Sequence, residues 1–599
     1  MSLLVVFAST SLNNREPSRV PLNSTFPVRF VLQQLTSLVV LFSALVFAAA
    51  DNQKTDVALT TAEHELQRAK TGLAKLDPAP YFLSYTIRHQ SSSLVVASQG
   101  GLLNSVQVQT RRADVVTRVG SPSLDNTHGE NRKSAMRSGF LPLEDDPDSI
   151  GRALWNLTYQ GYRDAAKAYL NIKTQTQVNA KEEDTSGDFA PQAASTYSET
   201  RQLPPAANQH DLEQMALKYS AAFRSYPLVY SSAVALTSET TRTYFVSSEG
   251  SRVVTSNAII RLAIQAETRA DDGMDLIRAE TFQAESLDHL PTASEVQARI
   301  TKMAADLTAL RNAPVAEPYD GPALLSGRAA AVFFHEVLGH RLEGQRQRGE
   351  KEGQTFTKKI NQPVLPDFLT VVDDPTQQKL NGADLSGWYE YDDEGVPAGR
   401  VDVVANGILK NFLMSRMPIQ GFDKSNGHGR GQAGLMPVGR QGNLIVTSTR
   451  RVSDGELRKR FIEEIKRQGK PYGLYFEDIE GGFTLTQRTM PQAFQVLPIL
   501  VWKVFPDGRP DELVRGVEIV GTPLAATSRI LVTGDKEEAF NGMCGAESGP
   551  VPVSAAAPAM LFADLETQKR PHSLNRPPIL PPPVAESKPS AATSKGGGR

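Results

Sequence analysis

The 599-residue sequence contains a single cysteine, Cys544, so no disulfide can form within the chain. It also lacks an excess of charge of either sign, because 64 lysines and arginines stand against 66 aspartates and glutamates. Proteins that bind nucleic acid usually carry a clear basic excess, so that class of function is disfavoured. Beyond residue 50, no apolar run has the roughly 20 residues that a membrane-spanning helix requires.

One apolar stretch lies near the N-terminus. Residues 35–50 read LTSLVVLFSALVFAAA, and three arginines but only one acidic residue precede them. A basic region, an apolar run and small residues at its end are typical of a secretory signal peptide, which we predict over residues 1–50 with cleavage near Ala50. A retained membrane anchor is the alternative, although the run is short for a span. The sequence therefore predicts a mature protein outside the cytoplasm, periplasmic or secreted, with no stable membrane span after cleavage.

The pattern of apolar residues predicts an α+β protein. Strand-like alternation at residues 102–119 and helical spacing at 294–312 indicate a mixed α/β N-terminal domain over residues 51–312. Short β-prone runs with dense glycine and proline then indicate a β-rich C-terminal catalytic domain over residues 313–569, which carries one buried motif helix. Residues 570–599 are rich in proline and small residues, and this composition predicts a disordered tail.

The motif helix contains the clearest chemical signal. Residues 331–344 read AVFFHEVLGHRLEG, in which His335 and His340 flank Glu336 and Gly339. The run before His335 is apolar on nearly every side, which is typical of a buried helix. Burying two histidines and a glutamate is costly unless they are paired or bind a metal, so the motif indicates a metal site. Hydrogen bonding within a packed core is the alternative interpretation.

The histidine spacing requires a departure from regular helix geometry. The known zinc-protease motif H-E-x-x-H spaces its histidines four apart, whereas these are five apart and would lie about 140° from each other on an ideal helix. Gly339 stands where the backbone could depart, through a π-bulge or a helix end. A catalytic zinc usually has three protein ligands, and the residues alone leave the third open among Cys544, Glu343 and His428.

Several sequence blocks together resemble the TldD/PmbA family of metallopeptidases. HEVLGHRLEG is followed by YDDEGVPAGRVDVVANG at residues 391–407, GHGRGQAGLMPVGRQGNL at 427–444 and NGMCGAESGPVPV at 541–553. The blocks occur in the order typical of the family, and each alone is a much weaker signal than the combination.

The resemblance implies a site and a reaction. It implies zinc (Zn²⁺) held by His335, His340 and Cys544, with Glu336 as the catalytic base. The implied function is a zinc-dependent peptidase that hydrolyses short or unfolded peptides outside the cytoplasm, with water activated by zinc. The implied assembly is a homodimer or a heterodimer with a related TldD/PmbA-type subunit. The alternative is a non-catalytic partner subunit of such a complex, with a structural metal site.

Other polar residues in the resembling blocks receive no catalytic role. Arg430 and Arg440 lie in glycine-rich segments and are predicted at the surface, with a place in the substrate channel as the alternative. His428 lies in SNGHGRG and is predicted to be exposed to solvent. The acidic residues 392–394 are predicted to shape a turn.

Overall fold

The computed structural model describes residues 56–129, 132–176, 184–204, 206–348, 352–484, 486 and 494–570. These residues belong to one compact unit. The predicted signal peptide lies outside the described residues, as does the predicted disordered tail apart from Arg570. No helix within the described ranges is both long enough and apolar enough to cross a membrane.

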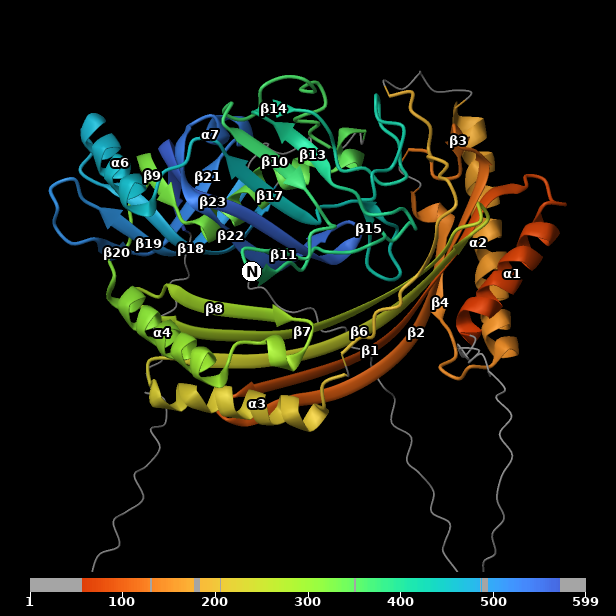
Figure 1. Ribbon diagram of the computed structural model, residues 1–599, viewed down its shortest axis with the longest axis horizontal. Coiled ribbons are helices and arrows are strands. Elements are labelled where there is room, and N and C mark those ends of the chain that lie inside the picture. The colour runs from red at the N-terminus through yellow and green to blue at the C-terminus, as the bar shows by residue number, and fades with distance from the viewer. Residues whose placement is uncertain are drawn as a thin grey trace, which may run out of the picture. The chain divides into compact units, whose positions relative to one another are not determined.

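The N-terminal half forms an eight-stranded, largely antiparallel sheet (Figure 1). Its main path has the order β3-β2-β1-β6-β7-β5, while β4 pairs with β2 and β8 pairs with β7. Alternate residues of β7 are buried. Residues 102–119 form part of the strand β2, but the alternating burial predicted there is wrong: residues 101–110 have no buried side chain, and residues 113–115 and 117–119 are all buried. The strands are β1 (Pro80–Ser98), β2 (Gly101–Ser121), β3 (Leu124–Asp125), β4 (Met136–Phe140), β5 (Thr196–Ser198), β6 (Ser231–Ser247), β7 (Arg252–Arg269) and β8 (Asp275–Ala284).

Four helices pack on this sheet, in two pairs (Figure 1). α3 (Gln209–Ala221) packs on β1, β2 and β6, and α4 (Ala293–Asn312) packs on β7 and β8. α4 begins with a reciprocal capping box between Thr292 and Glu295, which satisfies backbone N–H groups at its first turn. The other pair, α1 (Val57–Leu73) and α2 (Pro147–Thr176), packs on β1 and on β2 with β4, respectively.

The C-terminal half forms a second, eleven-stranded mixed sheet, so the predicted α+β class with a β-rich C-terminal region is confirmed. Its main path has the order β14-β13-β10-β17-β23-β21-β19-β18-β9, with β20 beside β19 and β22 beside β23. The strands are β9 (Tyr319–Leu325), β10 (Leu369–Asp373), β13 (Val401–Ala405), β14 (Ile408–Leu409), β17 (Asn443–Ser448), β18 (Gly473–Thr484), β19 (Phe494–Val504), β20 (Glu512–Val514), β21 (Val517–Gly521), β22 (Ile530–Ala546) and β23 (Gly549–Lys569).

Smaller elements complete this half. The helices are α5 (Gly327–Val337), α6 (Asp454–Arg467) and α7 (Pro523–Thr527), and two short strand pairs are β11 (Lys379–Leu380) with β12 (Ala383–Asp384) and β15 (Gly429–Arg430) with β16 (Val438–Gly439).

Ion pairs join the two halves. Arg278 of β8 lies 2.8 Å from Asp478 of β18, and its side chain is buried. Arg88 of β1 likewise lies 2.8 Å from Asp393, which follows the strand pair β11–β12 in the chain. The predicted domain boundaries at 312/313 and 569/570 stay predictions.

Candidate metal centre

The motif helix α5 is the buried helix that the sequence predicted. Ser326 caps its first turn by accepting a hydrogen bond from the Ala329 N–H, and every residue of the helix except Arg328 is buried. Phe333 packs edge-on against Phe494 of β19 and Phe562 of β23, with ring centroids 5.5 and 5.4 Å away. The sheet therefore packs directly against α5 within the core.

The backbone departs from α geometry after Val337. α5 ends at Val337, and a 3-10 turn follows over Gly339–Leu342. This turn brings the His340 ring to 5.0 Å from the His335 ring, centroid to centroid. The departure is thus a helix end, the second of the two predicted alternatives.

Gly339 permits this turn because it has no side chain. Its φ is not in the left-handed region, so backbone freedom is not what the position requires. A Cβ there would lie only 2.0 Å from the side-chain oxygen of Gln441, which is fully buried against the turn. The glycine is needed for close packing.

Cys544 reaches the histidines from the far end of the chain. It lies near the end of β22, where β22 turns back into β23 and Cys544 pairs with Val551. Its Sγ is 3.3 Å from Nε2 of His340. One potential ligand atom from each of His335, His340 and Cys544 lies within 4.8 Å of the others, and all three residues are buried. The structure therefore brings together the three residues predicted as ligands.

This donor set fits a divalent metal ion. Burial raises the pKa of the Cys544 thiol, but the adjacent His340 and His335 imidazoles outweigh burial and hold that pKa well below its usual value. The thiolate is the form that binds metal. Nδ1 of His335 is buried and has no hydrogen-bond partner among the described residues. Two imidazoles and a thiolate are nitrogen and sulfur ligands of the kind that zinc and related transition metals prefer.

Glu343 orients His340. Its Oε1 lies 3.2 Å from Nδ1 of His340, and its side chain is fully buried. Burial raises the pKa of Glu343, but His340 and Arg346 lower it to about 2, so the carboxylate is ionised and accepts the proton of Nδ1. Nε2 of His340 is then the nitrogen free to face Cys544. Arg440 completes the arrangement, with Nε 3.3 Å from Oε1 of Glu343.

Glu336 lies beside the ligand group and is not one of its members. Burial raises the pKa of its carboxyl above the usual value. Gly482 of β18 makes room for it, since a Cβ at that glycine would lie 2.7 Å from Cγ of Glu336. The main-chain oxygen of Glu336 accepts a hydrogen bond from Arg341 at 3.2 Å. A carboxyl with a raised pKa next to a metal site has the chemistry of a general base.

The surface positions predicted for three other residues are wrong, because their partners lie far away in the sequence. His428 is fully buried, with Nε2 3.2 Å from Asp373. Arg430 is buried, stacks on Tyr389 and donates to the main-chain oxygen of Gln441 at 2.6 Å. Arg440 is fully buried and donates to the main-chain oxygen of Cys544 at 2.6 Å. Two of the three residues left open as the third ligand thus have other partners. His428 contacts Asp373, and Glu343 contacts His340.

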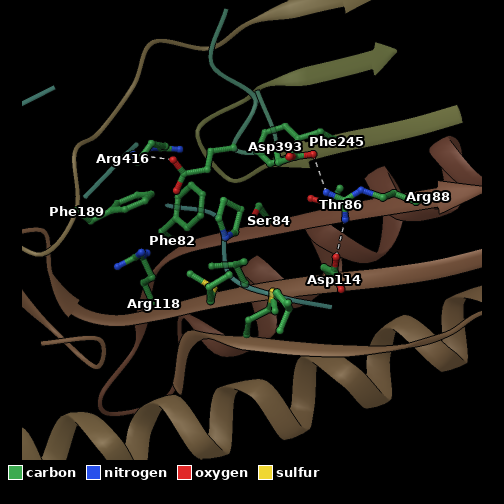
Figure 2. Close-up of a pocket in the computed structure, with 16 residues that line it drawn as sticks. Phe82, Ser84, Thr86, Arg88, Asp114, Arg118, Phe189, Phe245, Asp393 and Arg416 are labelled. Atoms are coloured by element: carbon green, nitrogen blue, oxygen red, sulfur yellow. Dashed lines mark hydrogen bonds and ion pairs between the residues drawn. The ribbon is translucent and has the colours of Figure 1, made fainter. Parts of the chain in front are cut away.

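The acidic residues 392–394 shape a turn, as predicted. Oδ1 of Asp392 accepts the backbone N–H of Glu394 at 3.0 Å and that of Val396 at 2.9 Å. Asp393 pairs with Arg88 at the edge of a small cavity between β1 and this turn (Figure 2). The cavity holds about 30 Å³, enough for roughly one water molecule and too little for a peptide.

Comparisons with known proteins cover the part of the chain that contains this site. Residues 318–569 match the PmbA/TldA metallopeptidase C-terminal domain. A protein named metalloprotease TldD homolog from Buchnera aphidicola is 26% identical over 248 residues, which cover 41% of this chain and 47% of that protein. A metalloprotease from Methanothermobacter thermautotrophicus is 24% identical over 488 residues, which cover 77% of this chain and 96% of that protein. The chain spans about half the length of the TldD homologs that it matches.

A solved structure extends the comparison to the fold of both halves. TldE from Thermococcus kodakarensis superposes with a TM-score of 0.56 over 85% of this chain and 100% of that chain, at 13% sequence identity. At this identity the likeness concerns the fold alone. The chain is thus similar in sequence to the PmbA/TldA metallopeptidase C-terminal domain over residues 318–569, which are less than half of its length, and similar in fold to TldE over both halves.

Proposed function

We propose that the protein is a zinc-dependent peptidase that hydrolyses short or unfolded peptides outside the cytoplasm. The observation that carries this proposal is the buried group of His335, His340 and Cys544 beside Glu336. Three protein ligands of nitrogen and sulfur leave one position of a tetrahedral zinc site open, as in catalytic rather than structural sites.

The residues of the chain have distinct parts in the reaction. When bound, zinc supplies a Lewis acid that polarises the scissile carbonyl and makes water more acidic. Glu336 takes the proton of the attacking water and delivers it to the leaving amine, a role that its raised pKa favours. Glu343 holds His340 in the tautomer whose Nε2 faces Cys544.

Location and assembly are part of the proposal. The apolar run at residues 35–50 supports export, with the mature chain periplasmic or secreted. The family resemblance supports a dimer, either of two copies of this chain or with a related subunit.

Glu336→Gln tests the reaction, because it keeps the volume of the side chain and leaves all three proposed ligands in place. We expect hydrolysis of a mixed pool of short peptides to fall by about 10²–10⁴-fold, since an amide cannot accept the proton. Zinc per chain and the melting temperature are expected to stay at native values. Glu463→Gln, on the exposed face of α6, is the matched control and should behave as native.

Two outcomes would count against the proposal. Near-native hydrolysis in Glu336→Gln would rule out Glu336 as the base. A native protein that holds one zinc per chain and cleaves nothing in the pool would favour the non-catalytic partner subunit.

A further inference from the structure

A groove lies between α1 and α2, which pack side by side in the N-terminal half (Figure 1). Its volume is about 620 Å³, and small-molecule sites usually have volumes of roughly 300–1,000 Å³. Each helix contributes five residues with the spacing i, i+1, i+4, i+5 and i+8, which places them along one face of that helix. The lining residues are Thr60, Thr61, His64, Glu65 and Arg68 of α1 and Pro147, Asp148, Gly151, Arg152 and Trp155 of α2.

An aromatic side chain forms part of one wall. Trp155 is 49% exposed, although tryptophan is a large apolar residue that is usually well buried. Its ring stacks on that of Tyr159, one turn further along α2, with 6.2 Å between the ring centroids and 13° between the ring planes. The stacking favours one orientation of the indole and leaves about half of the side chain open to a ligand. The groove therefore presents a flat apolar surface that suits the C–H face of a ring compound.

Three polar side chains of the lining are available for hydrogen bonds. The side chains of His64, Asp148 and Arg152 form no hydrogen bond or ion pair with another described residue. Glu65 differs from them, because it is buried and both of its carboxylate oxygens accept hydrogen bonds from Arg68, at 2.7 and 2.5 Å. The groove thus offers a free acceptor at Asp148, a free donor at Arg152 and a group of either kind at His64.

The charges that line the groove balance. Two arginines and two carboxylates line it, so its net charge is zero when His64 is neutral. This balance does not favour a strongly anionic ligand such as phosphate. A metal ion is not favoured either, because Glu65 is bonded to Arg68 and leaves only Asp148 among the carboxylates of the lining. The matching ligand is uncharged and both donates and accepts hydrogen bonds.

A sugar ring combines these properties. The C–H groups of a pyranose form an apolar face, which would lie on the indole of Trp155. Its hydroxyl groups each donate and accept, so they would donate to the carboxylate of Asp148 and accept from the guanidinium of Arg152. A neutral sugar also introduces no charge that the groove would have to compensate.

We propose that the groove between α1 and α2 binds a neutral saccharide, with one sugar ring stacked on Trp155 and its hydroxyl groups bonded to Asp148 and Arg152. The candidate metal centre is a different site, because its residues lie on α5, on the turn that follows α5 and on β22. The proposal is independent of the peptidase chemistry, and its tests require no hydrolysis.

The first test measures binding of neutral disaccharides to the native protein. The probes are cellobiose, maltose and N,N′-diacetylchitobiose, and calorimetric titration should give a Kd of about 1 mM or lower for at least one of them. Trp155→Ala removes the stacking surface and should weaken that binding by at least about tenfold. The position is half exposed, so circular dichroism and the melting temperature should stay native. Leu170→Ala, at a 52% exposed residue of the same helix outside the groove, is the matched control and should bind as native.

A second test separates a neutral sugar from a charged ligand. Asp148→Asn and Arg152→Gln keep hydrogen-bonding atoms and remove the charge, so each should weaken disaccharide binding by no more than about tenfold. Leucine, a zwitterion whose two charges would pair with Asp148 and Arg152, is the contrasting probe and should not bind.

Three outcomes would overturn the proposal. They are no binding of any of the three disaccharides, binding of leucine in their place, and disaccharide binding that Trp155→Ala leaves unchanged. Co-sedimentation with insoluble cellulose or chitin identifies the source of the sugar. Sedimentation that Trp155→Ala abolishes would support a glycan strand as the ligand, whereas binding of disaccharides alone would support a free oligosaccharide.

Discussion

Glu343→Gln separates the orientation of a metal ligand from the reaction itself. The native carboxylate is fully buried and lies 2.8 Å from Arg346, 3.2 Å from His340 and 3.3 Å from Arg440. The amide keeps the shape and removes the charge. It leaves Arg440 buried without its carboxylate, and breaking a buried ion pair costs roughly 3–5 kcal/mol. It also removes the ionised acceptor that selects the tautomer of His340.

The expected result has two parts. Zinc affinity, measured by competition with a chromogenic chelator, should fall by about 10–100-fold, the usual effect of losing the carboxylate partner of a histidine ligand. The free energy of unfolding of the metal-free protein, measured in urea, should fall by roughly 3–5 kcal/mol. Both measurements are independent of hydrolysis, so they hold whether or not the substrate has been identified.

Glu547→Gln provides the matched control. Glu547 also bonds Arg346, at 3.1 Å, but its side chain is 41% exposed and its pairing with Arg346 lies at the surface. An exposed pair contributes at most about 1 kcal/mol, so zinc affinity and stability should both stay close to native. If Glu343→Gln binds zinc within about twofold of native, Glu343 does not orient the ligand.

Three further predictions concern single positions. Cys544→Ser removes a predicted ligand, so zinc affinity, measured by chelator competition, should fall by more than the roughly 100-fold effect of losing an orienting residue. Unchanged affinity would exclude Cys544 as a ligand. Gly482→Ala places a methyl group 2.7 Å from Cγ of Glu336 and should displace that side chain. We expect kcat to fall by about 10²-fold while zinc content stays unchanged. A native kcat would show that Glu336 is not displaced. Burial raises the pKa of Asp125, but Arg118 and the Thr127 hydrogen bond outweigh burial and hold that pKa below its usual value. The stabilisation from Asp125 is therefore present above pH about 4 and is lost as the pH falls further. The free energy of unfolding of the metal-free protein, measured in urea, should then fall more steeply with decreasing pH in the native protein than in Asp125→Asn. Equal slopes in the two proteins would contradict this.

Local pattern predicted much of the secondary structure but not all of it. The buried helix α5 was predicted because its residues are apolar on every side, and alternation identified β2. α2 was missed although it is the longest helix among the described residues. Its buried stripe includes Ile150 and Leu154, but Trp155 and Tyr159 are also large and apolar and lie about half exposed. Apolar residues on both faces hide the 3.6-residue period on which a prediction depends.

Local sequence likewise predicted only part of the candidate metal centre. His335, Glu336 and His340 could be identified because they stand close together in one apolar segment, residues 331–344. The predicted third ligand could not be chosen from chemistry alone. Cys544 stands 204 positions from His340, and only the pairing of β22 with β23 places its Sγ beside the ring. The family resemblance supplied what the residues left open.

Buried arginines were the least predictable part of the site. An arginine in a glycine-rich segment has the local features of a surface residue, and its burial depends on a carboxylate or carbonyl partner elsewhere. Arg440 finds two such partners at once: its Nε lies beside Glu343, which holds His340, and its Nη2 donates to the main-chain oxygen of Cys544. One guanidinium therefore connects the supports of two predicted ligands that come from opposite ends of the C-terminal half. The chain's own hydrogen bonds thus hold His340 and Cys544 side by side, and the arrangement needed for the metal is built by the fold itself.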